Sequence, residues 1–106
     1  LFVCTANQQR SPTGEELYKS DPRFQVDSAG IATLHGRAVT EARLRWADIV
    51  VCMEQLHADA IREAFPQTAA EKRFYVLGIP DVYERMDPEL QEEIKSRFER
   101  LYAQEQ

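Results

Sequence analysis

Short apolar runs alternate with amphipathic stretches along this chain, and the alternation predicts strands that alternate with helices. Apolar runs at 1–4 and 49–53 are typical of buried strands, and the second is rich in β-branched residues. Residues 24–28 alternate between apolar and polar side chains, and 73–77 form the fourth predicted strand. This pattern predicts a three-layer α/β fold, a four-stranded parallel sheet with helices on both faces.

Capping residues and prolines mark the first two helices. Ser11 is a good N-cap, and Pro12 suits the first helical position because its missing N–H has no intrahelical partner there. Thr40 is expected to cap a short helix that runs through Trp46. Trp46 itself is expected to pack in the core.

Two more helices are predicted in the second half of the chain. Residues 54–65 carry apolar side chains at helical spacing, and Pro66 is expected to end that helix. His57, within it, is expected to face solvent. Asp87 and Pro88 mark the start of the last helix. The apolar stripe of that helix consists of Leu90, Ile94, Phe98 and Leu101.

The composition limits the possible classes of function. The 106 residues fit a single domain, residues 1–106, and a hydrophobic content of 43% is enough for one core. The formal net charge of −5 argues against a nucleic-acid partner, which needs a basic face, and against an anionic membrane surface. No apolar run is long enough to cross a bilayer, and no signal peptide is visible. The chain begins directly on an apolar run, so we expect a few residues to precede it.

The two cysteines indicate a reducing compartment. Cys4 and Cys52 lie far apart, form no disulfide framework and match no metal-ligand spacing. The histidines, His35 and His57, do not complete a metal site. We therefore expect a cytoplasmic protein without a metal or another cofactor. Cys52 is expected to be a small hydrophobic residue buried in its strand.

Residues that can carry chemistry fall at the carboxyl ends of the predicted strands. The first strand ends at Cys4, the second at 28–30, the third at Met53 and the fourth just before Asp81. Ligands of open parallel sheets bind beyond this edge. Four segments are therefore expected to converge on one site.

The segment from Cys4 to Ser11 has the features of an anion-binding loop, because it joins a strand to a helix N-terminus. The loop amides, the helix dipole and the Arg10 cation all favour the thiolate form of Cys4. A thiolate beneath a bound phosphate is placed for in-line attack on phosphorus, which gives a phosphocysteine intermediate. The phosphate-binding residues would be Thr5, Ala6, Asn7, Gln8, Gln9 and Arg10.

Two polar side chains of this loop would assist the thiolate. Ser11 can donate a hydrogen bond to it, and Asn7 can hold the loop in shape because asparagine tolerates left-handed backbone conformations. The alternative interpretation makes Cys4 a buried core residue and Arg10 a solvated surface residue. It leaves the close succession of loop, Ser11 and Pro12 unexplained.

Six segments, in order and spread over essentially the whole chain, carry a resemblance to a known family. They are Val3-Cys4, Asn7, Arg10-Ser11-Pro12-Thr13, Val26-Asp27-Ser28-Ala29-Gly30, Ala47-Asp48-Ile49-Val50-Val51-Cys52-Met53-Glu54 and Pro80-Asp81-Val82-Tyr83. In these segments the chain resembles the low-molecular-weight protein tyrosine phosphatases. The resemblance implies a phosphotyrosine phosphatase I-like fold. It also implies metal-independent hydrolysis of phosphate monoesters, from phosphorylated proteins or small aryl phosphates.

The resemblance also implies a role for each matched residue. Cys4 would be the nucleophile, and Arg10 would bind the phosphate and the transition state. Ser11 would assist the thiolate. Asp81 would be the general acid that protonates the leaving oxygen, and later the base for water. Tyr83 would form part of the wall that receives an aromatic ring of the substrate.

Three features depart from the family pattern. The family acid is usually followed by proline, but here Val82 follows Asp81, and a second Asp-Pro pair begins at Asp87. We favour Asp81 as the acid and Asp87 as a helix cap. Gln9 replaces a second loop cysteine of many members, so the nucleophile would lack a resolving thiol. The segment 31–39 is shorter than the usual specificity loop, which indicates a compact, bacterial-type member.

Two other functions stay open on the sequence alone. An arsenate reductase of the same fold would pass electrons through further cysteines, and only Cys52 is available. A phosphate-binding or phosphopeptide-binding module would lack a placed acid, and the unusual pair of Asp81 and Val82 keeps that interpretation open. In each case inorganic phosphate or another oxyanion would bind in the loop.

Overall fold

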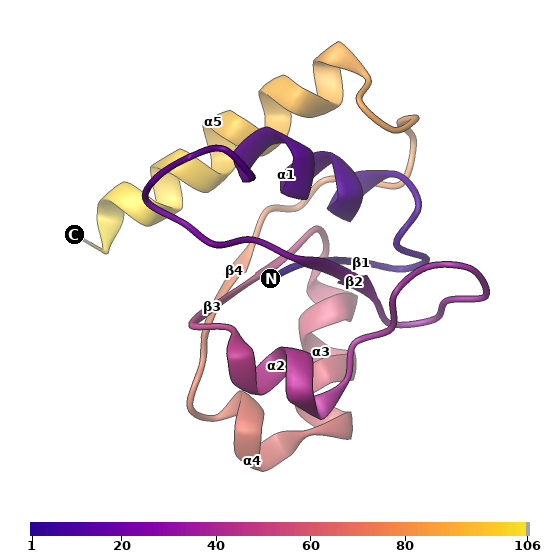
Figure 1. Cartoon of the computed structure of the whole chain (residues 1–106), viewed down its shortest axis with the longest axis vertical. Coiled ribbons are helices and arrows are strands. Elements are labelled where there is room, and N and C mark those ends of the chain that lie inside the picture. The colour runs from indigo at the N-terminus through magenta and orange to yellow at the C-terminus, as the bar shows by residue number, and fades with distance from the viewer. Residues whose placement is uncertain (106) are drawn as a thin grey trace.

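Strands and helices alternate along the chain. The structure, a computed structural model, describes residues 1–105 (Figure 1). Its elements are β1 (Phe2–Cys4), α1 (Arg10–Tyr18), β2 (Ser28–Gly30), α2 (Glu41–Trp46), β3 (Ile49–Cys52), α3 (Gln55–Ala64), α4 (Pro66–Ala69), β4 (Arg73–Val76) and α5 (Pro88–Gln104). This order is the α/β order that the sequence predicts.

The strands form one parallel sheet in the order β2-β1-β3-β4. Phe2 of β1 pairs with Ser28 of β2 on one side and with Val51 of β3 on the other. β4 pairs with the edge of β3 that faces away from β1. The predicted four-stranded parallel sheet is confirmed, and β1, which ends at Cys4, lies in its interior.

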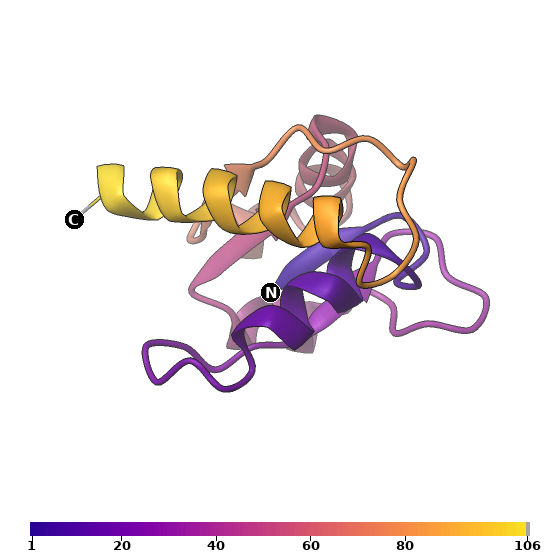
Figure 2. The ribbon, with the colours of Figure 1, turned by 90° about the horizontal axis from the view of Figure 1, so that it is seen from above.

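Helices cover both faces of this sheet. α1 and α5 pack together on one face, whereas α2, α3 and α4 lie on the other (Figures 1 and 2). The α1/α5 core contains Phe2 and Cys4, and the α2–α4 core contains Val3. Because side chains of a strand alternate between faces, the short apolar run of β1 contributes to both cores.

Loops that follow the strands meet at one end of the sheet. In Figure 1 the loops after β1, β2 and β4 all lie at its right-hand end. Backbone hydrogen bonds continue past the strands: Ile31 N donates to Cys4 O at 3.1 Å, and Ile79 N donates to Met53 O at 2.7 Å. This end of the sheet is the one at which the sequence predicts the site.

One predicted boundary is wrong. The sequence predicts a strand at 24–28, but β2 begins at Ser28. β1 starts at Phe2, which pairs with Ser28, so the ladder with β1 begins only there. The apolar residues of 24–28 pack against the α1/α5 core instead. α3 ends at Ala64, before Pro66, as predicted; Pro66 also begins the short helix α4, which the sequence did not predict, because proline is suited to the first helical position.

The helix caps agree with the sequence for α2 and α5 but not for α1. Thr40 and Asp87 each accept a backbone N–H of the first helical turn through a side-chain oxygen, at 3.1 and 2.8 Å. Ser11 is not a cap, because α1 begins one residue earlier, at Arg10. The hydroxyl of Ser11 contacts Cys4 instead.

The opposite end of the sheet carries an open pocket of about 240 Å³. Trp46, the last residue of α2, lines this pocket and is 46% exposed. Its prediction as a core residue is therefore wrong, because the end of α2 lies at the rim of the α2–α4 core. The pocket lies away from Cys4 and contains none of the predicted site residues.

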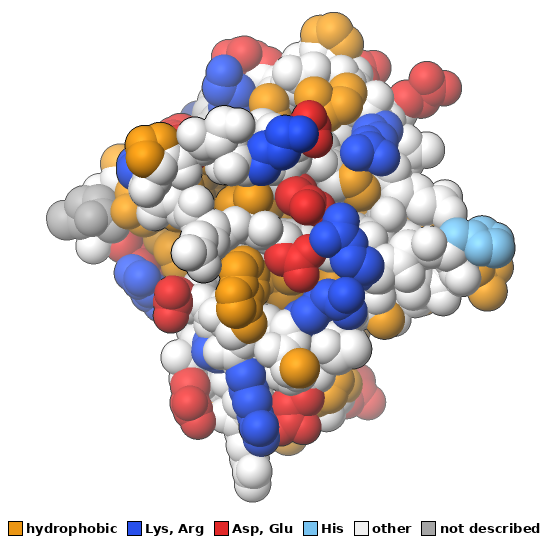
Figure 3. Space-filling view, viewed as in Figure 1, with side chains coloured by type: hydrophobic (Ala, Val, Ile, Leu, Met, Phe, Trp, Pro, Cys, Tyr) orange, Lys and Arg blue, Asp and Glu red, His pale blue; other side chains and the backbone are white. Residues whose placement is uncertain are grey.

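Acidic and basic side chains are interspersed on the surface. Figure 3 shows red and blue side chains next to one another on the face seen in Figure 1. Several of these charges form ion pairs between neighbouring elements. Within residues 1–105, no helix is long and apolar enough to cross a membrane.

Candidate active site

The candidate site is built around the thiol of Cys4. Cys4 is the last residue of β1 and is 3% exposed. Its Sγ lies 3.0 Å from Ser11 Oγ, and it accepts a hydrogen bond from Asn7 N at 3.3 Å. Two donors therefore converge on the sulfur, where the chain passes from strand to helix. Such donors stabilise a thiolate.

Asn7 holds the loop in its shape. Its φ is +57°, a left-handed conformation that asparagine tolerates better than most residues. The side-chain Nδ2 donates to Ser11 Oγ and to Ser28 Oγ, each at 3.0 Å. Oδ1 accepts from Arg37 N at 2.8 Å. The amide of Asn7 thus joins the loop to α1, to β2 and to the segment after β2.

The hydroxyl proton of Ser11 has two possible acceptors. Ser11 Oγ accepts from Asn7, so its single proton can go to Cys4 Sγ or to Ala29 O, at 3.0 and 3.3 Å. With a thiolate present, donation to sulfur is the favoured arrangement because the acceptor carries the charge. The sequence predicts a hydrogen bond from Ser11 to the thiolate, and the structure places the two atoms within reach.

Arg10 is held in one orientation inside the site. The residue is 1% exposed. Its Nη1 donates to Glu54 Oε2 at 2.6 Å and to Ile79 O at 2.8 Å. Its Nε lies 3.7 Å from Asp81 Oδ1. A buried guanidinium fixed by such contacts loses little conformational entropy when it binds an anion.

Glu54 and His57 hold both ends of the loop, and sequence reasoning assigned neither a role. Glu54 N donates to His57 Nδ1 at 3.0 Å, one half of a reciprocal capping box at the start of α3. His57 Nε2 therefore carries the proton and donates to Thr5 Oγ1 at 3.0 Å. Glu54 binds Arg10. The spacing Glu-x-x-His directly after a buried strand is the signal that could have identified them.

His57 is fully buried, so the prediction that it faces solvent is wrong. Burial, together with the nearby Arg10 cation, lowers the pKa of His57 to about 4. The imidazole is therefore neutral at physiological pH. A neutral ring is what the two hydrogen bonds require, because Nδ1 must accept while Nε2 donates.

The buried imidazole makes stability depend on pH. Between pH 6.5, the ordinary pKa, and about 4, the unfolded chain binds a proton at His57 that the folded chain does not. The free energy of unfolding should therefore fall as pH is lowered, by up to about 1.4 kcal/mol per pH unit. Urea unfolding between pH 4.5 and 7 should show a shallower dependence in His57→Asn. The exposed His35→Asn is the control and should keep the wild-type slope; equal slopes in all three proteins would contradict the prediction.

The loop after β4 brings Asp81 to the site. Asp81 has a side chain that is 63% exposed, and it reaches Arg10 from the solvent side. Two backbone N–H groups tie the loop to the start of α1. Arg85 N donates to Gln9 Oε1 at 2.6 Å, and Met86 N donates to Thr13 Oγ1 at 2.9 Å. The loop is therefore held by its later residues, while the Asp81 carboxylate stays accessible.

The other predicted residues are two in the loop after β4 and three in the phosphate loop itself. Asp87 is engaged as the cap of α5. Tyr83 is partly buried and packs against the α1/α5 core. Gln8 is exposed at the loop surface, whereas Thr5 and Ala6 are partly covered.

Cys52 is separated from Cys4 by the sheet. It belongs to the α2–α4 core, whereas Cys4 belongs to the α1/α5 core, so the two thiols face opposite ways. Burial raises the pKa of the Cys52 thiol to about 12. Across residues 1–105, no three His, Cys, Asp or Glu side chains gather in a way that could hold a metal ion.

Known proteins share this fold and part of this sequence. No family model matches the chain. A protein-arginine-phosphatase of Geobacillus stearothermophilus is 32% identical, in a match that covers 70% of this chain and 66% of that protein, just under two thirds of its length. The crystal structure of the tyrosine phosphatase Wzb from Escherichia coli K30, in complex with phosphate, matches with a TM-score of 0.78 at 23% identity. That match covers 97% of this chain and 94% of Wzb.

A third match carries the name of the family. The low-molecular-weight protein tyrosine phosphatase from T. tengcongensis matches with a TM-score of 0.69 at 20% identity, over 93% of this chain and 96% of that one. The structural matches establish the shared fold. That fold is the fold of the low-molecular-weight protein tyrosine phosphatases, and the matched proteins, the arginine phosphatase among them, are named as phosphatases.

Proposed function

We propose that this protein hydrolyses phosphate monoesters without a metal, through a phosphocysteine intermediate on Cys4. The observation that carries the proposal is the position of the Cys4 sulfur, which lies at the start of a strand–loop–helix turn and receives hydrogen-bond donors from Asn7 and Ser11. The fixed guanidinium of Arg10 and the accessible carboxylate of Asp81 lie beside the same loop. The likeness of the chain to proteins named as phosphatases supports this combination.

The first step transfers the phosphoryl group to sulfur. The Cys4 thiolate attacks phosphorus, the bond from phosphorus to the leaving oxygen breaks, and Asp81 gives its proton to that oxygen. Glu54 and Ile79 engage Nη1 of Arg10, so Nε and Nη2 are the donors that would bind the equatorial oxygens. The positive charge then stabilises the oxygens on which charge accumulates in the transition state.

The second step hydrolyses the phosphocysteine. The Asp81 carboxylate takes a proton from water, and the oxygen of that water attacks phosphorus. The bond from phosphorus to sulfur breaks, inorganic phosphate leaves, and the thiolate returns. Ser11 can donate to the departing sulfur, because its hydroxyl already lies 3.0 Å away. The substrate would be a phosphorylated protein or a small phosphomonoester, and free oxyanions would bind in the same loop.

Phosphoarginine is a second candidate substrate, because the relative that is 32% identical is a protein-arginine-phosphatase. The same steps would then break a bond from phosphorus to nitrogen, with Asp81 protonating the leaving guanidine. An arsenate reductase that closes a disulfide between its own two cysteines is disfavoured, since Cys4 and Cys52 lie on opposite faces of the sheet.

The test is hydrolysis of p-nitrophenyl phosphate by the reduced protein in EDTA, across pH, followed by phosphotyrosine and phosphoarginine peptides at equal concentration. We expect turnover that vanadate inhibits and that added metal does not raise, and the two peptides will assign the substrate class. Binding of inorganic phosphate without turnover of any of the three substrates would overturn the proposal in favour of a binding module.

A further inference from the structure

The short segment 31–39 lies along the phosphate loop and forms a layer over it. Ala32 N donates to Thr5 O at 2.9 Å, next to the bond from Ile31 to Cys4. Gly36 packs so closely that an added Cβ would lie 2.6 Å from Ala6 O and 2.7 Å from Asn7 Cβ. Segment 31–39 therefore contacts the phosphate loop along residues 4–7.

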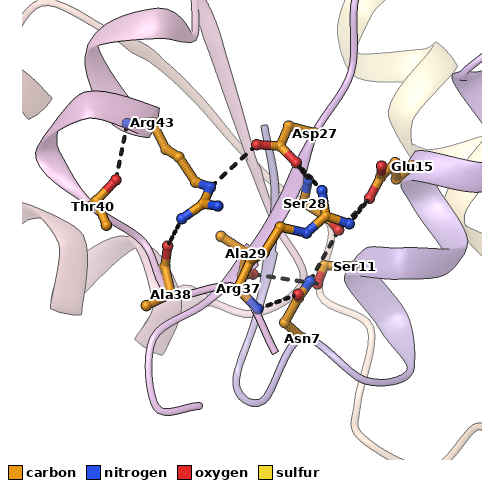
Figure 4. Close-up of polar contacts among 10 residues, drawn as sticks. All are labelled: Asn7, Ser11, Glu15, Asp27, Ser28, Ala29, Arg37, Ala38, Thr40 and Arg43. Carbon is orange, nitrogen blue, oxygen red and sulfur yellow. Dashed lines mark hydrogen bonds and ion pairs between the residues drawn. The ribbon is translucent and has the colours of Figure 1, made fainter. Parts of the chain in front are cut away.

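The side chain of Asn7 is closed into a ring of hydrogen bonds (Figure 4). Asn7 Nδ2 donates to Ser28 Oγ, which donates to Glu15 Oε1 at 2.6 Å. The same Glu15 oxygen accepts from Arg37 Nη2 at 2.8 Å, and Arg37 N donates back to Asn7 Oδ1. The ring joins four parts of the chain: the phosphate loop, α1, β2 and the segment 31–39.

Arg37 closes this ring and also forms an ion pair with Asp27. The same Asp27 carboxylate forms a second ion pair, with Arg43 of α2. Single exposed ion pairs contribute little to stability. Here two carboxylates with side chains only 23–25% exposed bind one guanidinium, so the pairs form a network that is partly shielded from water. Such a network can hold a segment in place where an isolated pair cannot.

We propose that Arg37 is a positioning residue for the nucleophile: its ion pairs with Glu15 and Asp27 hold segment 31–39 against the phosphate loop and fix the amide of Asn7. This inference rests on the proposed function of Cys4. The connection to the sulfur is short, because Asn7 N donates to Cys4 Sγ and Asn7 Nδ2 donates to Ser11 Oγ, the second donor at that sulfur. Loss of Arg37 should loosen both donors together.

Arg37→Met is the direct test, and Arg23→Met is its matched control. Arg23 is similarly exposed, 43% against 45% for the Arg37 side chain, and it also binds two carboxylates, on Asp21 and Glu99, away from the loop. We expect Arg37→Met to lower kcat about tenfold, equivalent to about 1.4 kcal/mol, with a smaller change in KM. Iodoacetate should alkylate Cys4 with a pH profile displaced to higher pH. Arg23→Met should leave both unchanged.

Two further variants keep the test decisive if Arg37→Met is too unstable to assay. Arg37→Lys retains one cationic contact and should restore part of kcat, whereas Glu15→Gln should reproduce the displaced alkylation profile. Alkylation and phosphate binding need no turnover, so they test the positioning role even if the hydrolysis itself fails. An unchanged alkylation profile and unchanged phosphate affinity in Arg37→Met and Glu15→Gln would overturn the inference.

Discussion

Replacement of Cys4 by serine is expected to lower turnover by at least about 10⁴-fold. Removal of the nucleophile lowers kcat on this scale in enzymes that use covalent catalysis. A hydroxyl is far less acidic than a thiol, and the donors of Ser11 and Asn7 cannot generate an alkoxide at neutral pH. The loop amides and Arg10 stay in place, because serine occupies slightly less volume than cysteine. Inorganic phosphate should therefore still bind, within a few fold of the wild-type affinity by calorimetry.

Cys52→Ala is the control for this substitution. Cys52 is buried in the α2–α4 core and does not touch the site, so the variant should keep wild-type turnover per folded molecule while losing some stability. Wild-type turnover in Cys4→Ser would rule out the phosphocysteine mechanism. If Cys52→Ala were fully folded and still lost turnover, the result would implicate the second thiol and favour redox chemistry.

The fold could be predicted because its local signals agree with the tertiary arrangement. The apolar run 49–53 is too short for a typical helix and too apolar for a loop, and it forms β3 in the sheet. The alternation at 24–28 led to the wrong prediction of a strand there. It reflects packing against the edge of the α1/α5 core and not pairing with another strand. Periodicity reports which side chains are buried, and it does not report whether the backbone has a partner.

The nucleophile loop, with Asn7 and Ser11, was visible in the sequence, but the residues outside the loop that support it were not. Glu54 and His57 follow β3, more than 40 positions after the loop whose two ends they hold. Arg37 and Glu15 meet only because the segment after β2 folds back over the loop. Contacts of this kind depend on the sheet order, which local patterns do not specify. The sequence predicts two roles for Ser11, and the structure has only the contact with Cys4, because α1 begins one residue earlier, at Arg10.

Asp81→Asn is expected to slow the first chemical step by about 10²- to 10⁴-fold for substrates with poor leaving groups. Asparagine keeps the shape of the carboxyl group but has no proton to give to the leaving oxygen. The loss should be much smaller for p-nitrophenyl phosphate, because that leaving group departs well without protonation. A series of aryl phosphates assayed under single-turnover conditions should therefore show a steeper dependence on leaving-group pKa in the variant than in the wild type.

Asp87→Asn is the matched control, because it makes the same chemical change in the same loop. The Asp87 side chain accepts the backbone N–H of Glu89 at the start of α5, and asparagine caps a helix about as well as aspartate. Turnover of every substrate in the series should stay near the wild-type rate. If instead Asp87→Asn steepened the leaving-group dependence and Asp81→Asn did not, the acid would be Asp87. The loop would then have to move on substrate binding, because Asp81 and not Asp87 lies beside Arg10.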